Sequence, residues 1–163
     1  MSLFDNFTSG FGGTQAPDFP DDLKWLNSSP LKLSKLKGKV VLVDFWTYSC
    51  INCQRTLPYL KTWWQKYQDK GLVIIGVHTP EFEFEKELKN VKEALKKYDV
   101  TWPVVLDNDY LIWNSFANHY WPAKYLIDHQ GKIIYTHFGE GNYQETELEI
   151  QKEIGRASCR ERV

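Results

Sequence analysis

The amino-acid sequence predicts an α/β protein in which helices flank a mixed central sheet. Apolar runs at 39–46 and 72–77 have the character of buried strands, and each is followed by a segment with helical periodicity. Near the end, strand-like segments at 123–128 and 132–138 are joined by a short turn containing Gly131, which is typical of a hairpin. The predicted order is therefore β-α-β-α-β-α-β-β-α. This order favours a core of parallel strands to which the hairpin adds an antiparallel strand.

The first predicted strand, residues 39–46, leads directly into the first predicted helix. The strand is β-branched and almost continuously apolar, which indicates that both of its faces are buried. The helix is expected to run from about Cys50 to Tyr67, because apolar side chains recur three or four residues apart. These side chains are Leu57, Leu60, Trp64 and Tyr67. Pro58 lies inside this pattern and predicts a kink after the first two turns.

The remaining elements follow from the same kind of pattern. A brief turn is expected at 34–36, before the first strand. Apolar side chains that recur every three or four residues predict an amphipathic helix from Phe84 to Tyr98. Three further elements are predicted after it: a strand at 104–106, a short helix at about 110–118 and a final helix from near Gln144.

The two ends of the chain differ in composition from its middle. Residues 1–20 are rich in Gly, Ser, Thr and Phe and are expected to form a flexible lead-in. Residues 155–163 have no apolar period and an abrupt excess of Arg, which indicates a cloning remnant or a disordered tail. A single domain at 21–154 is long enough to bury a hydrophobic core.

Composition and charge exclude several classes of function. The net charge is -1 and no basic stripe is present, so nucleic-acid binding is not expected. No apolar stretch is long enough to span a bilayer, so direct membrane insertion is not expected either. The N-terminus lacks the pattern of a signal peptide, which predicts a cytoplasmic location for the chain as written. The few cysteines exclude a disulfide scaffold.

The most informative motif is Cys50-Ile51-Asn52-Cys53, at the junction between the first strand and the first helix. A thiol at a helix N-terminus lies where backbone N–H groups and the helix dipole stabilise a thiolate. We therefore expect Cys50 to attack a disulfide. Cys53, one turn later and more buried, is expected to resolve the mixed disulfide by attacking Cys50.

Other uses of this cysteine pair fit the sequence less well. A zinc ribbon needs a second pair of ligands, and a haem attachment motif needs His directly after the second cysteine, where Gln54 stands. No nucleotide-binding motif is visible, so we expect neither a cofactor nor a metal. The structural alternative is a pair of buried thiols without a function.

Two carboxylates are candidates to assist the thiols. Asp44 lies inside an apolar strand, where burial raises the pKa of a carboxyl and makes its charge costly without a partner or a role. It is expected to take the proton of Cys53. The alternative is that it points to the edge of the sheet and meets a lysine. Glu81 follows the second strand, and it lies either near the thiols or in solvent. The solvated alternative groups it with Glu83, Glu85 and Glu87.

These residues resemble the thioredoxin signature. The matching features are the buried aspartate Asp44, Trp46 before the motif, the cysteine spacing and Pro58. The extra β-α unit at about 72–98 is similar to the insertion of the TlpA-like redoxins. Three further stretches support this resemblance: 102–107 and 121–128, which look TlpA-like, and 46–59, which is most similar to the thioredoxin-like domain of DipZ-type proteins.

The resemblance implies a thioredoxin fold and thiol–disulfide oxidoreductase activity. Our leading interpretation is an enzyme that reduces protein disulfides. It implies that Pro122 is a cis-proline facing the dithiol and that Glu81 lies near the cysteines. The residues expected to contact a protein substrate are Trp46, Ser49, Trp121 and Pro122. Ser49 stands where thioredoxin has Trp, so we expect a different docking surface. The Ile-Asn pair between the cysteines replaces the Gly-Pro of thioredoxin.

The expected partners are disulfide-containing proteins and an upstream dithiol electron donor, which can be membrane-bound. DipZ-type domains usually hang from a membrane domain on the extracytoplasmic side, so an excised domain of that kind is the alternative location. Two other functions compete with disulfide exchange. A thiol peroxidase of the peroxiredoxin type partly suits Thr47 and Cys50, although the upstream Pro of that motif is missing. A non-catalytic thioredoxin-fold binding module is the other, and the intact Cys-x-x-Cys argues against it.

Overall fold

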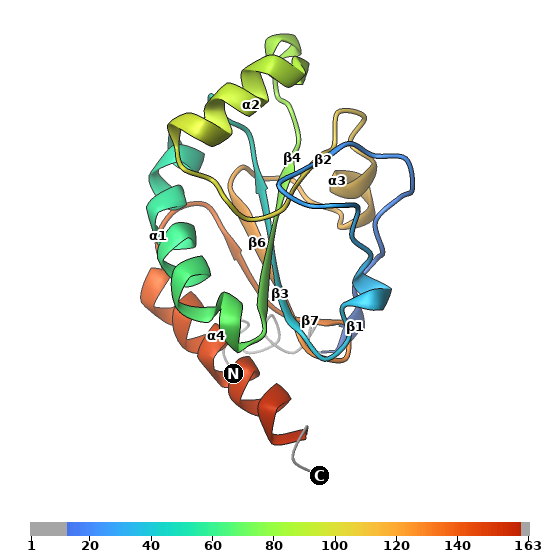
Figure 1. Cartoon of the computed structure of the whole chain (residues 1–163), viewed down its shortest axis with the longest axis vertical. Helices are drawn as coiled ribbons and strands as arrows, with labels where there is room; N and C mark the ends of the chain where they lie inside the picture. The colour runs from blue at the N-terminus through green and yellow to red at the C-terminus, as the bar shows by residue number, and fades with distance from the viewer. Residues whose placement is uncertain (1–12, 161–163) are drawn as a thin grey trace, which may run out of the picture.

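A seven-stranded mixed sheet forms the centre of the computed structural model, which describes residues 13–160 (Figure 1). Its strands lie in the order β1-β7-β6-β3-β4-β5-β2. The strand bounds are β1 Thr14–Gln15, β2 Trp25–Leu26, β3 Val40–Trp46, β4 Leu72–His78, β5 Val104–Leu106, β6 Ala123–Ile127 and β7 Lys132–Phe138. Strands β3, β4 and β5 are parallel, whereas β6 pairs antiparallel with both β3 and β7. The predicted parallel core and late hairpin are therefore confirmed.

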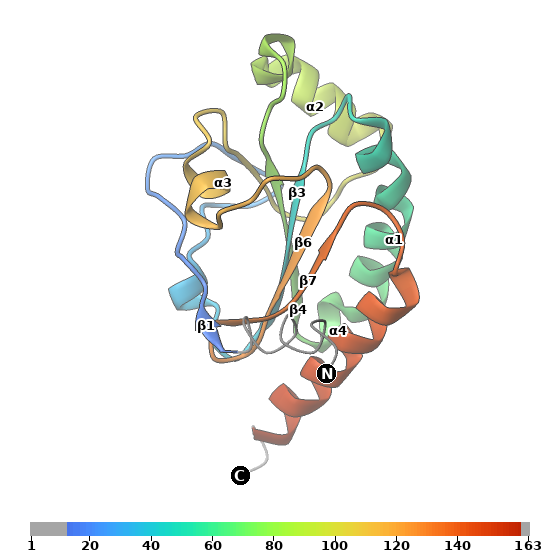
Figure 2. The same ribbon diagram turned by 180° about the vertical axis from the view of Figure 1, so that it is seen from behind.

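Helices cover both faces of this sheet. The α-helices are α1 Ile51–Tyr67, α2 Leu88–Lys97, α3 Leu111–Ser115 and α4 Tyr143–Arg160, and the 3-10 helices are η1 Leu33–Lys35, η2 Gln68–Lys70 and η3 Glu83–Lys86. Helices α1 and α4 lie together on one face, and α3 lies on the other (Figures 1 and 2). Among residues 13–160, no helix has the length and apolar character needed to cross a membrane.

Strand β3 is buried along its whole length, as its apolar sequence predicts. Side chains alternate between the two faces of a strand. Leu42 and Trp46 accordingly pack in the cluster that includes α1, whereas Val43 packs in the cluster that includes α3. Asp44 is two residues from both Leu42 and Trp46, so its side chain points to the same face of the sheet. The strand therefore directs this carboxylate toward the layer that contains α1.

Two helical predictions need correction. In α1, Trp63 is the tryptophan buried in the core, and Trp64 only packs against its edge. Two adjacent tryptophans fit the same helical period, so spacing alone does not separate them. The helix predicted from Phe84 begins only at Leu88, and Phe84 is exposed. A 3-10 turn precedes it, because the Glu85 side chain accepts backbone N–H groups there.

The ends of the domain extend beyond the predicted bounds. Residues 1–12 of the expected lead-in lie outside the described residues, but β1 pairs with β7 and Phe19 is buried against Trp25. From Thr14 onward, this segment is therefore part of the fold. Helix α4 continues to Arg160, so the part of the expected tail that the structure describes is helical. Residues 161–163 lie outside the described residues, and the origin of the tail stays a prediction.

Gly76 in β4 makes room for two buried tryptophan rings. A Cβ at this position would lie 2.9 Å from Trp46 Nε1 and 3.4 Å from Trp102 Nε1. Both rings are almost fully buried and can move only if the core repacks. We expect Gly76→Ala to lower the free energy of unfolding by about 1–3 kcal/mol. Denaturant titration measures this change, and an unaltered midpoint would contradict the packing argument.

Candidate active site

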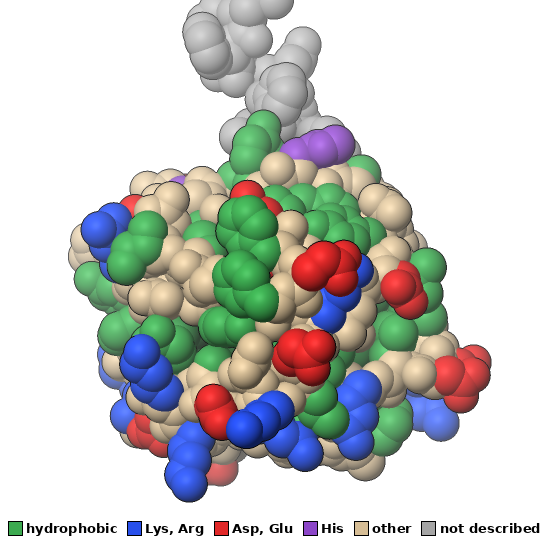
Figure 3. Space-filling view, turned by 90° about the horizontal axis from the view of Figure 1, so that it is seen from above, with side chains coloured by type: hydrophobic (Ala, Val, Ile, Leu, Met, Phe, Trp, Pro, Cys, Tyr) green, Lys and Arg blue, Asp and Glu red, His purple; other side chains and the backbone are tan. Residues whose placement is uncertain are grey.

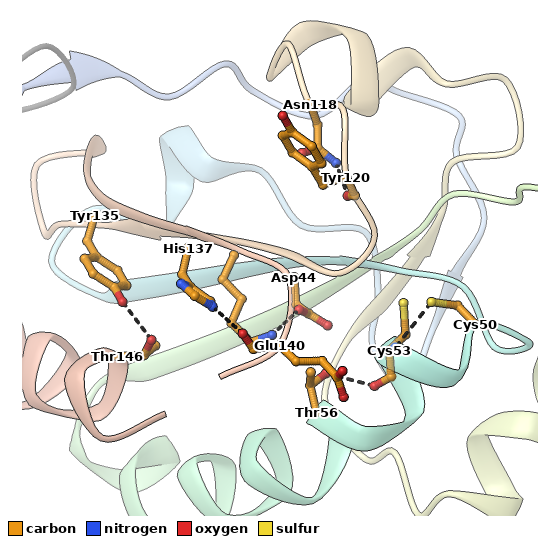
Figure 4. Close-up of polar contacts among 11 residues, drawn as sticks. Asp44, Cys50, Cys53, Thr56, Asn118, Tyr120, Tyr135, His137, Glu140 and Thr146 are labelled. Carbon is orange, nitrogen blue, oxygen red and sulfur yellow. Dashed lines mark hydrogen bonds and ion pairs between the residues drawn. The ribbon is translucent and has the colours of Figure 1, made fainter. Parts of the chain in front are cut away.

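Cys50 is the N-cap residue of α1, with the extended backbone that this position requires. Its Sγ accepts a hydrogen bond from the backbone N–H of Cys53 at 3.3 Å, and its own N–H donates to the carbonyl of Thr47 at 3.3 Å. Cys50 is half-buried, Cys53 is fully buried, and both are free thiols (Figure 4). The strand-to-helix junction therefore presents one accessible sulfur and holds the second behind it.

The two thiols have opposite acidities. A hydrogen bond from the Cys53 thiol, together with the backbone N–H groups of Cys53 and Asn52, lowers the pKa of Cys50 to about 7, although burial and the charge of Glu81 oppose this. Burial raises the pKa of Cys53 well above that of an ordinary thiol, and the hydrogen bond to Cys50 adds to this effect. Cys50 is therefore the thiol that ionises near neutral pH.

This difference predicts selective alkylation of the reduced protein. We expect the rate of Cys50 modification by iodoacetamide to rise with pH through a midpoint near 7, because only the thiolate reacts. Cys53 should stay unmodified over the same range. The Cys53→Ala change should move the Cys50 midpoint upward, since it removes the thiol that donates to Cys50. Peptide mass mapping distinguishes both sites from the exposed Cys159. Equal rates at Cys50 and Cys53 would contradict this assignment.

Asp44 is almost fully buried and forms an ion pair with an equally buried lysine. Lys124 Nζ lies 3.1 Å from Asp44 Oδ1, and the two residues are directly opposite each other in the β3–β6 ladder. Burial raises the pKa of Asp44, and the positive charge of Lys124 opposes that rise. The charge of Asp44 in turn raises the pKa of Cys53, which places the carboxylate within electrostatic range of the inner thiol (Figure 4).

The lysine partner was the alternative expected for Asp44, but the pair lies inside the sheet and not at its edge. Sequence analysis did not single out Lys124. Its position could have been identified from the sequence, because Lys124 is a lone charge in an otherwise apolar strand, as Asp44 is in β3. A proton-accepting role for Asp44 stays a prediction.

Glu81 is exposed. A different glutamate, Glu85, contacts the residue that precedes Cys50. Glu85 is fully buried, where sequence analysis grouped it with solvated loop residues. It accepts hydrogen bonds from the hydroxyl of Ser49 and from the backbone N–H groups of Glu81 and Phe82. The sequence carries no signal for this burial, because Glu85 lies in a run of alternating Glu and Phe.

His78, at the end of β4, is the second functional neighbour that sequence analysis missed. Its buried ring accepts a hydrogen bond at Nε2 from the backbone N–H of Tyr48, at 3.2 Å, and stacks on the Tyr48 ring. Burial lowers the pKa of His78 to about 4, so the ring is neutral at pH 7. His78 therefore supports the loop before Cys50 as a neutral acceptor.

The residues expected to contact a substrate lie in different environments. Trp46 is 1% exposed and packs edge-on against His78, so its ring is not available for direct contact. The prediction that Trp46 contacts a protein substrate is therefore corrected, because β3 is covered on both faces. Ser49 is exposed, and the half-buried Trp121 donates from its indole N–H to the carbonyl of Thr79 at 2.9 Å. The Trp121–Pro122 bond is cis, as the resemblance implied, and Pro122 is buried.

The surface above the sheet is mixed in character. In the view from above, hydrophobic side chains are interspersed with acidic and basic ones (Figure 3). Large exposed hydrophobic side chains next to the motif and on the loop after β4 include Ile51, Phe82 and Phe84. Within residues 13–160, no group of three or more His, Cys, Asp or Glu side chains could hold a metal ion.

The chain is similar to known proteins over most of its length. The family model described as Redoxin matches residues 12–152. Protein DipZ of Mycobacterium bovis is 48% identical over 140 residues, which cover 84% of this chain and 20% of that protein. The chain thus spans about a fifth of the length of this relative.

Other matches cover most of the other protein as well, and two of them serve as examples. Thiol-disulfide oxidoreductase YkuV of Bacillus subtilis is 31% identical over 77% of this chain and 82% of its own length. A solution structure of a thioredoxin-like protein in the oxidized form has a TM-score of 0.79 and 28% identity, and the match covers 88% of this chain and 97% of that one.

Proposed function

We propose that this chain, which belongs to the redoxin family, is a thiol–disulfide oxidoreductase that exchanges disulfides with proteins through Cys50 and Cys53. The observation that carries the proposal is the placement of the Cys50 sulfur. It caps α1, its pKa is lowered to about 7, and a buried second thiol lies one turn further on. A half-buried thiolate with a resolving thiol behind it is the arrangement that a two-step exchange requires.

In the first step, the Cys50 thiolate attacks one sulfur of a substrate disulfide. A Cys50–substrate disulfide forms, the substrate S–S bond breaks, and the other substrate sulfur leaves as a thiolate that takes up a proton. In the second step, Cys53 gives its proton to Asp44 and attacks Cys50 Sγ. The substrate leaves with both sulfurs reduced, having taken up two electrons, and the protein is left oxidised with a Cys50–Cys53 disulfide.

We assign the chain the role of a reductant, with electrons supplied by another dithiol. As the DipZ-type resemblance implies, we propose that the protein acts on the extracytoplasmic side of a membrane, where a membrane-bound protein would supply those electrons. The donor attacks the accessible Cys50 Sγ and Cys53 leaves as a thiolate that takes up a proton. The lowered Cys50 pKa then makes Cys50 a good leaving group when the second thiol of the donor breaks the donor–Cys50 disulfide.

Insulin reduction by dithiothreitol tests the exchange activity. The protein should accelerate the precipitation of the insulin B chain, and Cys159→Ser should do so equally, because Cys159 is an exposed thiol on α4. A rate equal to that of dithiothreitol alone would contradict the proposal.

The direction of electron flow depends on the reduction potential. Equilibration in graded thiol/disulfide buffers, followed by alkylation and mass measurement, gives this value. We expect a potential at or below about −250 mV, as for a reductant. A value near about −120 to −180 mV would instead identify an oxidant or isomerase and overturn the reductant assignment.

A further inference from the structure

We propose that Glu85 is a positioning residue for disulfide exchange: its buried carboxylate connects the loop before Cys50 to the loop after β4, and so holds Cys50 at the start of α1. The proposal rests on the function proposed for Cys50. It concerns a residue that makes no contact with the reacting sulfur and acts through Ser49.

Glu85 accepts several hydrogen bonds. Its Oε1 accepts from the Ser49 hydroxyl, and its Oε2 accepts from the backbone N–H groups of Glu81 at 2.6 Å and Phe82 at 3.0 Å. A buried carboxylate is costly unless such bonds compensate for lost hydration. Burial raises the pKa of Glu85, but hydrogen bonds from Ser49, Phe82, Thr47 and Glu81 outweigh it and lower the pKa overall. Glu85 is therefore a buried anion at neutral pH.

The donors to Glu85 lie in two separate loops. Ser49 immediately precedes Cys50, whereas Glu81 and Phe82 lie in the loop between β4 and η3. One carboxylate thus joins two loops that are more than 30 positions apart in the sequence. Glu85 also fixes the backbone of Glu81, whose charge acts on Cys50.

Tyr48, in the loop before Cys50, is held by bonds that do not involve the Glu85 carboxylate. The backbone N–H of Tyr48 donates to His78, its carbonyl accepts from Gln54 Nε2 at 2.8 Å, and its hydroxyl donates to the carbonyl of Phe84 at 3.2 Å. Ser49 is the last residue before the nucleophile, and its hydroxyl is held by Glu85. Loss of that bond should therefore loosen Cys50 without unfolding the loop.

Several titratable groups face this cluster. His78, Tyr48 and Tyr110 each feel the charge of Glu85, and Glu81 acts on Cys50. Because His78 is neutral near pH 7, it does not change charge over the range in which Cys50 ionises. The pH dependence of Cys50 alkylation is therefore a readout of Cys50 itself.

The test is the pH midpoint of Cys50 alkylation by iodoacetamide in the full chain. Ser49→Ala removes the hydrogen bond from the Ser49 hydroxyl to Glu85 at an exposed position, so we expect a folded protein whose Cys50 midpoint moves from about 7 toward the ~8.5 of a free cysteine. Ser49→Thr keeps the hydroxyl and should restore the original midpoint. Glu83→Gln, on the exposed neighbour that pairs with Lys86, is the matched control and should change nothing.

Glu85→Gln separates position from charge. Its amide oxygen can still accept the two backbone N–H groups, and its amide N–H can face the Ser49 hydroxyl, but the bonds are weaker without the charge. A positioning role predicts that this variant also raises the Cys50 midpoint. A purely electrostatic role predicts that it lowers the midpoint and that Ser49→Ala leaves it unchanged.

Three results would overturn the inference: an unchanged midpoint in Ser49→Ala, a failure of Ser49→Thr to restore the original midpoint, or a lowered midpoint in Glu85→Gln. Alkylation reports on the thiol whether or not the protein exchanges disulfides. A negative result here is therefore distinguishable from failure of the insulin assay, which would overturn the proposed function.

Discussion

The Cys50→Ser variant is expected to lose insulin reduction by about 10³-fold or more, whereas Cys53→Ser is expected to retain substrate as a stable mixed disulfide. Serine at position 50 removes the sulfur that forms the first bond and provides no nucleophile of comparable acidity. Serine at position 53 leaves Cys50 in place at the start of α1, but it removes the thiol that releases the substrate.

Intact mass measurement after incubation with an oxidised protein substrate checks both outcomes. Cys53→Ser should show an added substrate mass that dithiothreitol removes, and Cys50→Ser should show none. Cys159→Ser serves as the control, because it should behave like the unaltered protein. Adduct formation in Cys50→Ser but not in Cys53→Ser would reverse the assignment of attacking and resolving cysteines.

Asp44→Asn is expected to slow the resolving step by about 10²-fold or more at neutral pH, because Cys53 loses its proton acceptor. The pKa of Cys53 is raised by burial, so this thiol does not ionise unaided near neutral pH. The variant should still form the mixed disulfide, since the Cys50 pKa is lowered chiefly by the Cys53 thiol. Rapid mixing followed by acid quench and mass measurement separates the two steps. An unaltered resolving rate and pH profile would remove Asp44 from the mechanism.

Lys124→Met provides an independent test of the same proton acceptor. Asp44 accepts a proton only when ionised, and Lys124 is the charge that opposes the rise of its pKa on burial. Without Lys124, the pKa of Asp44 should rise further, and the resolving step should reach its full rate only at higher pH. The double change of Asp44→Asn with Lys124→Met should show no such pH dependence. Circular dichroism establishes that the variants are folded.

The sequence predicts the fold well where local patterns agree with tertiary packing. Strand β3 and helix α1 follow from an apolar run and from helical spacing, and both lie within one residue of the predicted bounds. The strands β1 and β2 are only two residues long and pair with distant segments, so no local period identifies them.

Site residues can be predicted from the sequence where their type and spacing by themselves indicate a reaction. Cys50 and Cys53 follow from their spacing at a strand-to-helix junction. Glu85 and His78 were missed, because their burial arises from contacts between loops that are far apart in the sequence. A charged residue in an alternating surface-like run gives no local indication that another segment will enclose it.

The central claim is that Cys50 and Cys53 form a reversible disulfide, and peptide mass mapping of the oxidised protein tests it most directly. After equilibration with an oxidising thiol/disulfide buffer and alkylation, the account predicts a Cys50–Cys53 linkage, a protein lighter by two hydrogen atoms, and full reversal by dithiothreitol. If no internal disulfide forms at any buffer ratio, the exchange mechanism is contradicted, and a non-catalytic thioredoxin-fold binding module becomes the better description.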